Sequence, residues 1–313
     1  MARLGLALLA AVLLAPGCQQ TPNEPAPKEP ARTSGATGVL SVGSVSLNPG
    51  REYQTFRPFA DYLASRLGEV GIGNGRVVVA DSLSKMVADL QRGSVDLFID
   101  SPFPVAFVCD RAGSRPILRR WKRGSDVYHS VIFVRADSGI ASADDFRGRI
   151  IAFGEPFSTT GYLLPKAALA SSGLRLVNYE DPAATIQPDH VGYVFSNDAE
   201  NTMFWVLKKK VAAGAVNADY FEALAGSRIE ELRIIHRTEE VPRNVVCVRD
   251  GLDPELIRAV EEVLLAMDED PQGRSVLSGF EQTARFDRFP GGSADQLGRV
   301  MELLAYVEED LGR

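Results

Sequence analysis

The sequence predicts an α/β protein with largely parallel sheets. Strand-like and helix-like segments alternate along almost the whole of residues 39–313, an order that builds parallel sheets through helical crossovers. This body holds about 275 residues, which is enough for one large or two modest domains. Polar residues directly follow several of the predicted strands, at the carboxyl ends where open α/β sheets bind ligands.

Apolar spacing defines the elements of the first half. Phe56, Phe59, Leu63 and Leu67 share one face of a helix, and three consecutive valines at 77–79 form the centre of a strand. In chain order the predicted elements are a strand at 38–46, a helix at 53–67, a strand at 76–80, a helix at 82–92, a strand at 96–100 and a helix at 101–112.

A second series of elements begins at residue 131. Its predicted strands lie at 131–135, 149–153, 191–195, 213–216, 232–238 and 245–249, and its predicted helices at 161–172, 198–209, 254–267, 271–279 and 293–312. Polar residues follow four strands of the two series: Asp100 and Ser101, residues 155–160, residues 196–198, and Asn217. Each of these fits a helix cap when taken alone, but together they favour one shared cleft.

The most informative segment is 153–165, which reads FGEPFSTTGYLLP and leads from a strand into a helix. The first N–H groups of a helix have no internal partner and lie at the positive end of its dipole, so they attract anions. Ser158, Thr159 and Thr160 add neutral donors, and Gly161 lets a ligand approach the backbone. Pro165 lacks an N–H, which keeps the turn open. The turn therefore predicts a site for a small oxyanion.

Residues 1–20 predict export. Arg3 precedes an apolar run at 4–14, about half of the roughly 20 residues that a spanning helix needs, so the run is typical of a signal peptide. The small residues before Cys18 resemble a bacterial lipoprotein signal, in which the cysteine is diacylated and becomes the first mature residue. A plain secretory signal is the alternative. Residues 19–37 are proline-rich and lack apolar periodicity, which predicts an extended tether.

The charge of the chain argues against nucleic acid as a partner. The formal net charge is −7, and removal of 1–17 takes away only Arg3, which leaves −8. Nucleic-acid binding needs basic patches. An anionic ligand remains compatible with this charge, because a desolvated pocket can bind an anion through neutral dipoles.

The sequence predicts no enzyme, no cofactor and no metal. His129, His190 and His236 are scattered without the spacing of metal ligands, and no nucleophile elbow, P-loop or dinucleotide motif is present. Cys109 and Cys247 both lie in apolar runs. They form either a disulfide or two buried free thiols, and the sequence does not choose between these states.

Six segments of the body together follow the pattern of a known family: 128–140, 146–154, 158–165, 195–202, 210–217 and 241–244. These segments resemble phosphate/phosphite/phosphonate-type substrate-binding proteins of ABC transporters. The resemblance covers nearly all of 39–290, and its most specific part is the Ser-Thr-Thr-Gly motif.

The resemblance implies a two-lobed periplasmic-binding-protein fold of type 2, with two crossover strands and the ligand in the cleft between the lobes. The expected organisation is a lipoprotein signal peptide at 1–17, a lipid-anchored disordered linker at 18–38, lobe one at 39–130 and 242–313, and lobe two at 131–241. The protein would then lie on the periplasmic side of the cell envelope and contact the membrane only through the lipid on Cys18.

The resemblance also assigns the ligand site. It implies that Ser158, Thr159 and Thr160 bind the phosphorus-centred oxygens through hydroxyls and helix N-terminal amides. The other expected ligand contacts are Tyr53, in the loop after the first strand, and Ser101, Tyr128, Asn197 and Asp198.

One position departs from the family pattern. Ala212 stands where many members have an aspartate, so we expect a small oxyanion (phosphate, phosphite, methylphosphonate or an arsenic analogue) rather than an aminoalkylphosphonate. Glu155 and Asp100 are candidates to accept a hydrogen bond from a protonated ligand oxygen, which would favour a ligand with an acidic O–H over sulfate.

Three functions compete. The leading interpretation is a receptor that closes over an oxyanion and delivers it to an ABC permease. The second is a sensor of the same fold that presents its liganded state to a histidine kinase and binds an arsenic oxyanion, for which Cys109 is the candidate thiol. The third is a phosphoesterase, which would need a metal or an activated nucleophile that the sequence does not show.

Overall fold

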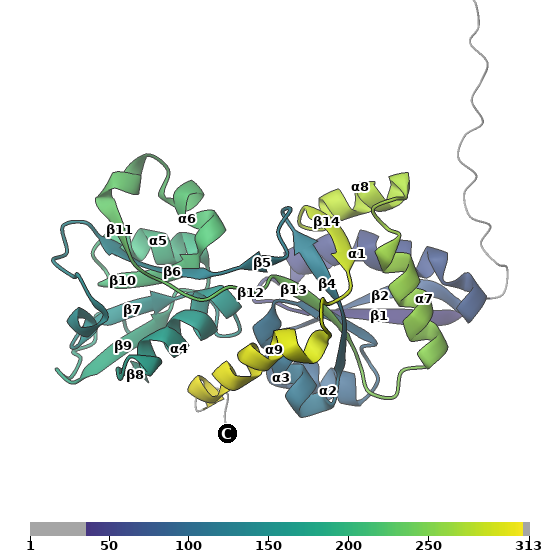
Figure 1. Cartoon of the computed structure of the whole chain (residues 1–313), viewed down its shortest axis with the longest axis horizontal. Coiled ribbons are helices and arrows are strands. Elements are labelled where there is room, and N and C mark those ends of the chain that lie inside the picture. The colour runs from purple at the N-terminus through teal and green to yellow at the C-terminus, as the bar shows by residue number, and fades with distance from the viewer. Residues whose placement is uncertain (1–35, 309–313) are drawn as a thin grey trace, which may run out of the picture. The chain divides into compact units, whose positions relative to one another are not determined.

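The computed structural model describes residues 36–308, apart from the side chains of 293–296. These residues contain two six-stranded mixed sheets, each covered by helices (Figure 1). The predicted signal peptide, Cys18 and most of the predicted linker lie outside the described residues. Gly38, the last residue of that linker, is already the first residue of strand β1.

The first sheet has the strand order β14-β4-β13-β3-β1-β2. Its strands are β1 (Gly38–Val45), β2 (Ile72–Ala80), β3 (Leu97–Asp100), β4 (Arg115–Lys122), β13 (Asn244–Val248) and β14 (Thr283–Asp287). The helices of this half are α1 (Pro49–Arg66), η1 (Gly68–Val70), α2 (Leu83–Gln91), α3 (Pro102–Ala112), α7 (Pro254–Leu265), α8 (Pro271–Gly279), α9 (Ser293–Leu303) and η5 (Leu304–Tyr306).

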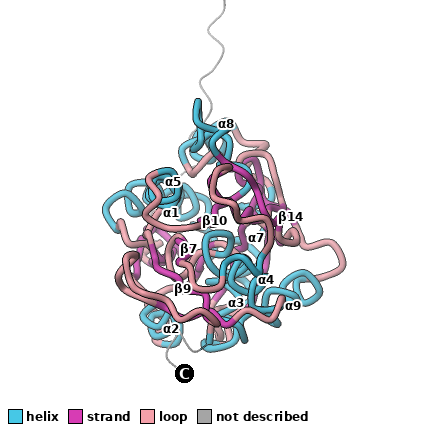
Figure 2. Tube along the Cα trace, turned by 90° about the vertical axis from the view of Figure 1, so that its left-hand side faces the viewer, coloured by secondary structure: helices cyan, strands magenta, loops and turns pink. Residues whose placement is uncertain are grey.

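The second sheet has the order β11-β6-β10-β7-β9-β8. Its strands are β6 (Ser130–Arg135), β7 (Ile150–Phe153), β8 (Arg175–Asn178), β9 (His190–Phe195), β10 (Ala213–Asn217) and β11 (Leu232–Arg237). Its helices are η2 (Ala143–Phe146), the π-helix η3 (Thr159–Leu163), α4 (Leu164–Ser171), α5 (Ala199–Leu207), α6 (Ala218–Ala225) and η4 (Gly226–Glu231). Figure 2 shows the second sheet end-on, with β7 and β10 between α5 and α4.

The chain crosses between the sheets twice. The short strands β5 (Val127–Tyr128) and β12 (Val241–Pro242) pair antiparallel between the two sheets (Figure 1). Both crossings lie beside the boundaries 130/131 and 241/242 that the sequence predicts for the lobes.

The C-terminal segment contacts both halves of the protein. Helix α9 packs against α3, β4 and β12, and η5 reaches α4 of the second half. The hydroxyl of Ser171 on α4 lies 3.2 Å from that of Tyr306. Arg299 pairs at 2.9 Å with Glu239, in the segment that leads from the second sheet to β12.

The sheets are less parallel than predicted. Five of the ten strand pairings within them are parallel, because β13 returns between β3 and β4 in the first sheet and β6 lies between β10 and β11 in the second. Four further elements were not predicted from the sequence: β4, β8, α6 and β14. In β4, cationic residues obscure the apolar alternation. Arg120 is nevertheless buried, with Glu281 and Thr283 as partners.

Aromatic rings pack helix α1 against the first sheet. The ring centroid of Phe280 lies 4.8 Å from that of Phe56 and 4.3 Å from that of Phe59, both on α1. The guanidinium of Arg120 lies 3.9 Å from the centroid of Phe280. All four side chains are buried, so the rings and the cation form one packed unit.

Thr159 joins the two halves through hydrogen bonds. Its hydroxyl accepts from the N–H of Phe103 at 2.9 Å and donates to the hydroxyl of Ser101 at 2.9 Å. Phe103 is the second residue of α3, so a side chain from the second half caps a helix of the first half.

Phe280→Ala should lower the free energy of unfolding by about 3–5 kcal/mol, since it opens a cavity between α1 and the sheet. Urea denaturation measures this loss. The control is Phe204→Ala, at a ring that is 53% exposed, which should change the free energy by less than about 0.5 kcal/mol. Equal losses in the two variants would contradict the packing described.

Thr159→Val should lower the free energy of unfolding of the ligand-free protein by about 1–3 kcal/mol, because the buried N–H of Phe103 loses its acceptor. Thr159→Ser keeps the hydroxyl and loses one methyl group, so we expect a cost of about 0.8 kcal/mol. Urea denaturation of both variants compares them. A valine variant no less stable than the serine variant would show that the bond between the halves contributes nothing.

Candidate functional site

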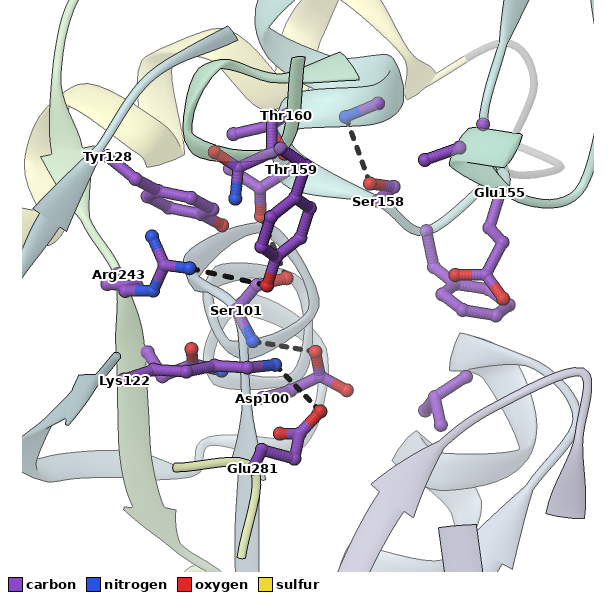
Figure 3. Close-up of a pocket in the computed structure, with 18 of the residues that line it drawn as sticks. Asp100, Ser101, Lys122, Tyr128, Glu155, Ser158, Thr159, Thr160, Arg243 and Glu281 are labelled. Carbon is purple, nitrogen blue, oxygen red and sulfur yellow. Dashed lines mark hydrogen bonds and ion pairs between the residues drawn. The ribbon is translucent and has the colours of Figure 1, made fainter. Parts of the chain in front are cut away.

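A cavity of about 280 Å³ lies between the two halves and is lined by both of them (Figure 3). The carboxyl ends of β1, β3, β7 and β10 contribute to its lining, as do the first residues of α5. Three of the four polar strand ends singled out above contribute Asp100 and Ser101, residues of 155–160, and Asn217; from 196–198 only Asp198 contributes. The ends of strands in two different sheets therefore meet at one site, as expected for open α/β sheets.

The structure brings together six of the eight expected ligand contacts. These are Ser101, Tyr128, Ser158, Thr159, Thr160 and Asp198. Tyr53 and Asn197 are not among the residues that line the cavity.

Tyr53 is displaced because helix α1 begins earlier than predicted. Asn48 caps the helix and Pro49 is its first residue, so Tyr53 lies within the helix and not in the preceding loop. Successive helical residues point about 100° apart. Glu52 and Phe56, one turn apart, face the cavity, whereas Tyr53 is 44% exposed and its hydroxyl accepts from Arg57.

Asn197 is displaced because its backbone forms a turn. Its φ of 68° is left-handed, its N–H donates to the Gly154 carbonyl at 3.4 Å, and its side chain is exposed. Asp198 follows as the cap of α5 and accepts from the N–H of Asn201.

Pro165 explains the shape of the turn at 158–163. It has no N–H to give to the Gly161 carbonyl, which instead accepts from the N–H of Gly154 at 2.9 Å. The N–H of Leu163 bonds the carbonyl of Ser158, five residues back, in the manner of a π-helix. Among the described residues, nothing accepts from the N–H groups of Thr159 and Thr160.

The glycine of the motif is required by close packing. The Ser158 hydroxyl accepts from the N–H of Gly161 at 3.0 Å. A Cβ on Gly161 would lie 2.8 Å from the Ser158 Oγ and 3.4 Å from the Gly154 Cα. A side chain at position 161 would therefore displace Ser158 and change the shape of the turn.

Two buried polar atoms in the cavity have no hydrogen-bond partner among the described residues: the Tyr128 hydroxyl and the Arg243 Nε. Tyr128 is 7% exposed and Arg243 is 1% exposed. The other guanidinium nitrogens of Arg243 reach Asp219 and the Tyr220 hydroxyl. Burial raises the pKa of Tyr128, so its phenol stays protonated and is a donor. Such unpaired donors are costly, and a bound acceptor would satisfy them.

Carboxyl groups line the rest of the cavity. Burial raises the pKa of Asp100 to about 7, with nearby Glu52 acting in the same direction. Burial also raises the pKa of Glu155 to about 7, together with the charges of Glu52 and Asp198. The pKa of Glu52 is raised by its burial, which outweighs a 2.5 Å hydrogen bond from Ser44.

The cations on the floor of the cavity are already paired. Glu281 contacts Arg120 at 3.0 Å and Lys122 at 2.7 Å. Burial acts to raise the pKa of Glu281, but these two cations outweigh it and lower the pKa to about 2. The three groups form a fixed ion cluster beneath the site.

The inference from Ala212 was wrong. Ala212 precedes β10 and bonds the Ile150 carbonyl at the opposite end of the sheet, whereas Asn217, at the carboxyl end of β10, lines the cavity. An alanine at position 212 therefore carries no information about the ligand.

Sequence reasoning missed five charged residues of the site: Glu52, Arg120, Lys122, Arg243 and Glu281. Arg243 belongs to the motif 241–244, which was recognised without a role for the arginine. Glu52 lies on α1, whose predicted start is too late in the sequence, and Arg120 and Lys122 lie on β4, which was not predicted. No local sequence signal indicates that these side chains, or that of Glu281, face the cavity.

The remaining sequence predictions can be placed on the described part of the chain. Cys109 and Cys247 are free thiols, and neither lines the cavity. Within residues 36–308, no three His, Cys, Asp or Glu side chains gather as a metal site requires. In the same range no helix is both long and apolar enough to cross a membrane.

Known proteins share both the sequence pattern and the fold. The family model of periplasmic phosphonate substrate-binding proteins of ABC transporters matches residues 44–294. XAC2383 from Xanthomonas citri, solved with chloride, is 30% identical over 87% of this chain and 99% of its own, with a TM-score of 0.83. The same protein was also solved with ATP.

More distant structures share the fold. PhnD1 from Prochlorococcus marinus in complex with methylphosphonate is 17% identical, with a TM-score of 0.66 over 87% of this chain and 98% of its own. A binding protein of a phosphonate ABC transporter from Pseudomonas aeruginosa is 18% identical, with a TM-score of 0.65 over 86% of each chain. The family match spans most of the chain, and the predicted type 2 periplasmic-binding-protein fold is confirmed. The protein belongs to the family of periplasmic phosphonate substrate-binding proteins of ABC transporters.

Proposed function

We propose that the protein captures a small phosphorus oxyanion, namely phosphate, phosphite or a phosphonate, for an ABC permease. The observation that carries this proposal is the set of unsatisfied donors in one cavity: the N–H groups of Thr159 and Thr160, the Tyr128 hydroxyl and the Arg243 Nε. A tetrahedral oxyanion accepts several hydrogen bonds in different directions, which suits donors from separate elements.

The size of the cavity limits the ligand. Its volume of about 280 Å³ is at the lower edge of the range for pockets that hold drug-sized ligands, which is roughly 300–1,000 Å³. XAC2383 was solved with two anions of very different size, chloride and ATP. The cavity of this chain fits a small anion and not one of the size of ATP.

The carboxyl groups narrow the choice among oxyanions. Asp100 accepts a hydrogen bond from a ligand O–H, and fully deprotonated sulfate offers none. Without the argument from Ala212, an aminoalkylphosphonate is again a candidate, with its ammonium group toward Glu52 and Asp198. Thermal unfolding with both kinds of ligand, described below, distinguishes a small oxyanion from an aminoalkylphosphonate.

The two halves act as lobes in this proposal. Residues 39–130 with 242–313 form lobe one, residues 131–241 form lobe two, and β5 and β12 form the hinge. Closure excludes water and strengthens each hydrogen bond to the ligand. Cys18 carries the lipid that holds the protein at the membrane, and residues 18–38 are the tether.

A sensor of the same fold that signals to a histidine kinase is the alternative. Its arsenic-binding form loses support, because Cys109 lies outside the lining of the cavity. The members of this family bind solutes for transporters, and our proposal includes no catalytic step.

Thermal unfolding tests the ligand class. The purified protein, stripped of bound ligand, is heated with phosphate, phosphite, methylphosphonate, 2-aminoethylphosphonate, arsenate, arsenite or sulfate. A ligand at 100 times its Kd stabilises the protein by about 2.7 kcal/mol, which raises Tm visibly. A rise with phosphorus oxyanions and none with sulfate supports the proposal. A rise with arsenite alone would favour the sensor, and no rise with any ligand would reject the oxyanion site.

Tyr128→Phe should leave the stability of the ligand-free protein unchanged or slightly raised, because its hydroxyl forms no hydrogen bond within residues 36–308. The same change should weaken binding of the responding ligand by roughly 10- to 100-fold, since one hydrogen bond to a charged group is lost. Calorimetric titration measures the affinity and urea denaturation the stability. Unchanged affinity would remove Tyr128 from the site.

A further inference from the structure

Three carboxyl groups lie beside the donors of the cavity without a cationic partner. They are Glu52 on α1, Asp100 at the end of β3 and Glu155 in the turn after β7. Glu52 accepts from the Ser44 hydroxyl at 2.5 Å, and Asp100 from the N–H of Ser101 at 2.6 Å. No described residue donates a hydrogen bond to Glu155. Glu52 and Glu155 come from different halves of the protein, and both line the cavity.

The cations of the cavity offset these groups only in part: burial raises the pKa of Glu52 more than Lys122 and Arg120 lower it. Arg120 and Lys122 are paired with Glu281, and Arg243 is paired with Asp219. Asp198, a further carboxylate near Glu155, holds the start of α5 through Asn201. Tyr220 contributes a phenol that accepts from Arg243.

Two independent atoms point to a ligand here. The Tyr128 hydroxyl and the Arg243 Nε are more than nine-tenths buried, form no hydrogen bond within residues 36–308 and belong to residues that line the same cavity. A bound anion that satisfies them lies in the same cavity as Glu52, Asp100 and Glu155, which are half-buried. In such a space, like charges repel far more strongly than in water.

Protonation of a carboxyl group removes the repulsion between that group and the bound anion. A carboxylate can only accept hydrogen bonds, whereas a carboxylic acid also donates one, so a protonated Glu155 turns from a repelling group into a donor. The pKa of Glu155 and that of Asp100 are both about 7, so the proton is available near neutral pH at little cost.

We propose that the protein binds its oxyanion together with one proton, which Glu155 shares with the ligand opposite Glu52 and Asp100. This inference rests on the proposed function and adds that capture of the anion is coupled to proton uptake. A nearby anion favours the protonated acid, so binding raises the pKa of the carboxyl group further. Affinity is then highest below pH 7 and falls as the pH rises above 7, by up to tenfold per pH unit for one coupled proton.

Calorimetric titration at pH 7.5 in buffers of different ionisation enthalpy counts the protons taken up. We use methylphosphonate as the probe and repeat the titration between pH 6 and 8.5. The inference requires uptake of a substantial fraction of one proton and weaker binding at high pH. Binding without uptake and without pH dependence overturns the inference but leaves the proposed function intact. A complete lack of binding by methylphosphonate and the other oxyanions rejects the proposed function itself.

Glu155→Gln distinguishes a proton on the protein from a proton on the ligand. The amide mimics the protonated acid, so the variant should take up fewer protons, bind as well as the wild type at pH 6 and bind about tenfold better at pH 8.5. A merely damaged site would lose affinity at every pH. The control is Glu200→Gln on the exposed first turn of α5, outside the cavity, which should leave both quantities unchanged. Unchanged proton uptake in Glu155→Gln would assign the proton to the ligand and overturn the inference.

Discussion

The site depends on a single missing hydrogen bond donor, the N–H that Pro165 lacks. Because the Gly161 carbonyl receives no bond from residue 165, it accepts from Gly154 and fixes the turn against the end of β7. As the first residues of the helix, Thr159 and Thr160 have N–H groups without an internal partner, and both residues line the cavity. The same turn positions the Thr159 hydroxyl to cap α3 in the other half. The lining of the cavity and the contact between the halves thus share one backbone geometry.

The cavity combines groups that are unstable in isolation. Buried donors without partners cost free energy, and so do buried carboxylates without cations. The ion cluster of Arg120, Lys122 and Glu281 is satisfied within the protein, so the unsatisfied groups are confined to the walls that face a ligand. The residues of the ion cluster therefore support the site, whereas the unsatisfied groups on its walls can bind a ligand.

The order of strands and helices and the turn at 158–163 could be predicted because both rest on local patterns. The helix with Phe56 and Phe59 follows from spacing, and the hydroxyls of 158–160 follow from their place after a strand. Strand β4 and the early start of α1 were missed, and with them Glu52, Arg120 and Lys122. These depend on partners distant in sequence: the buried Arg120 bonds Glu281 and Thr283, which lie 161 and 163 residues further along the chain. Ala212 was assigned to the wrong end of β10, which shows that a motif can locate a strand without indicating which end of the strand faces a site.

The C-terminal segment has a consequence for how far the protein can open. Helix α9 packs on α3 and β12, η5 reaches α4, and Tyr306 touches Ser171 in the second half. The two crossover strands permit rotation about their own line, whereas this third connection lies off that line. Rotation must therefore shear its contacts or release its end. Any rotation of the halves about β5 and β12 would therefore act directly on the contact between Tyr306 and Ser171.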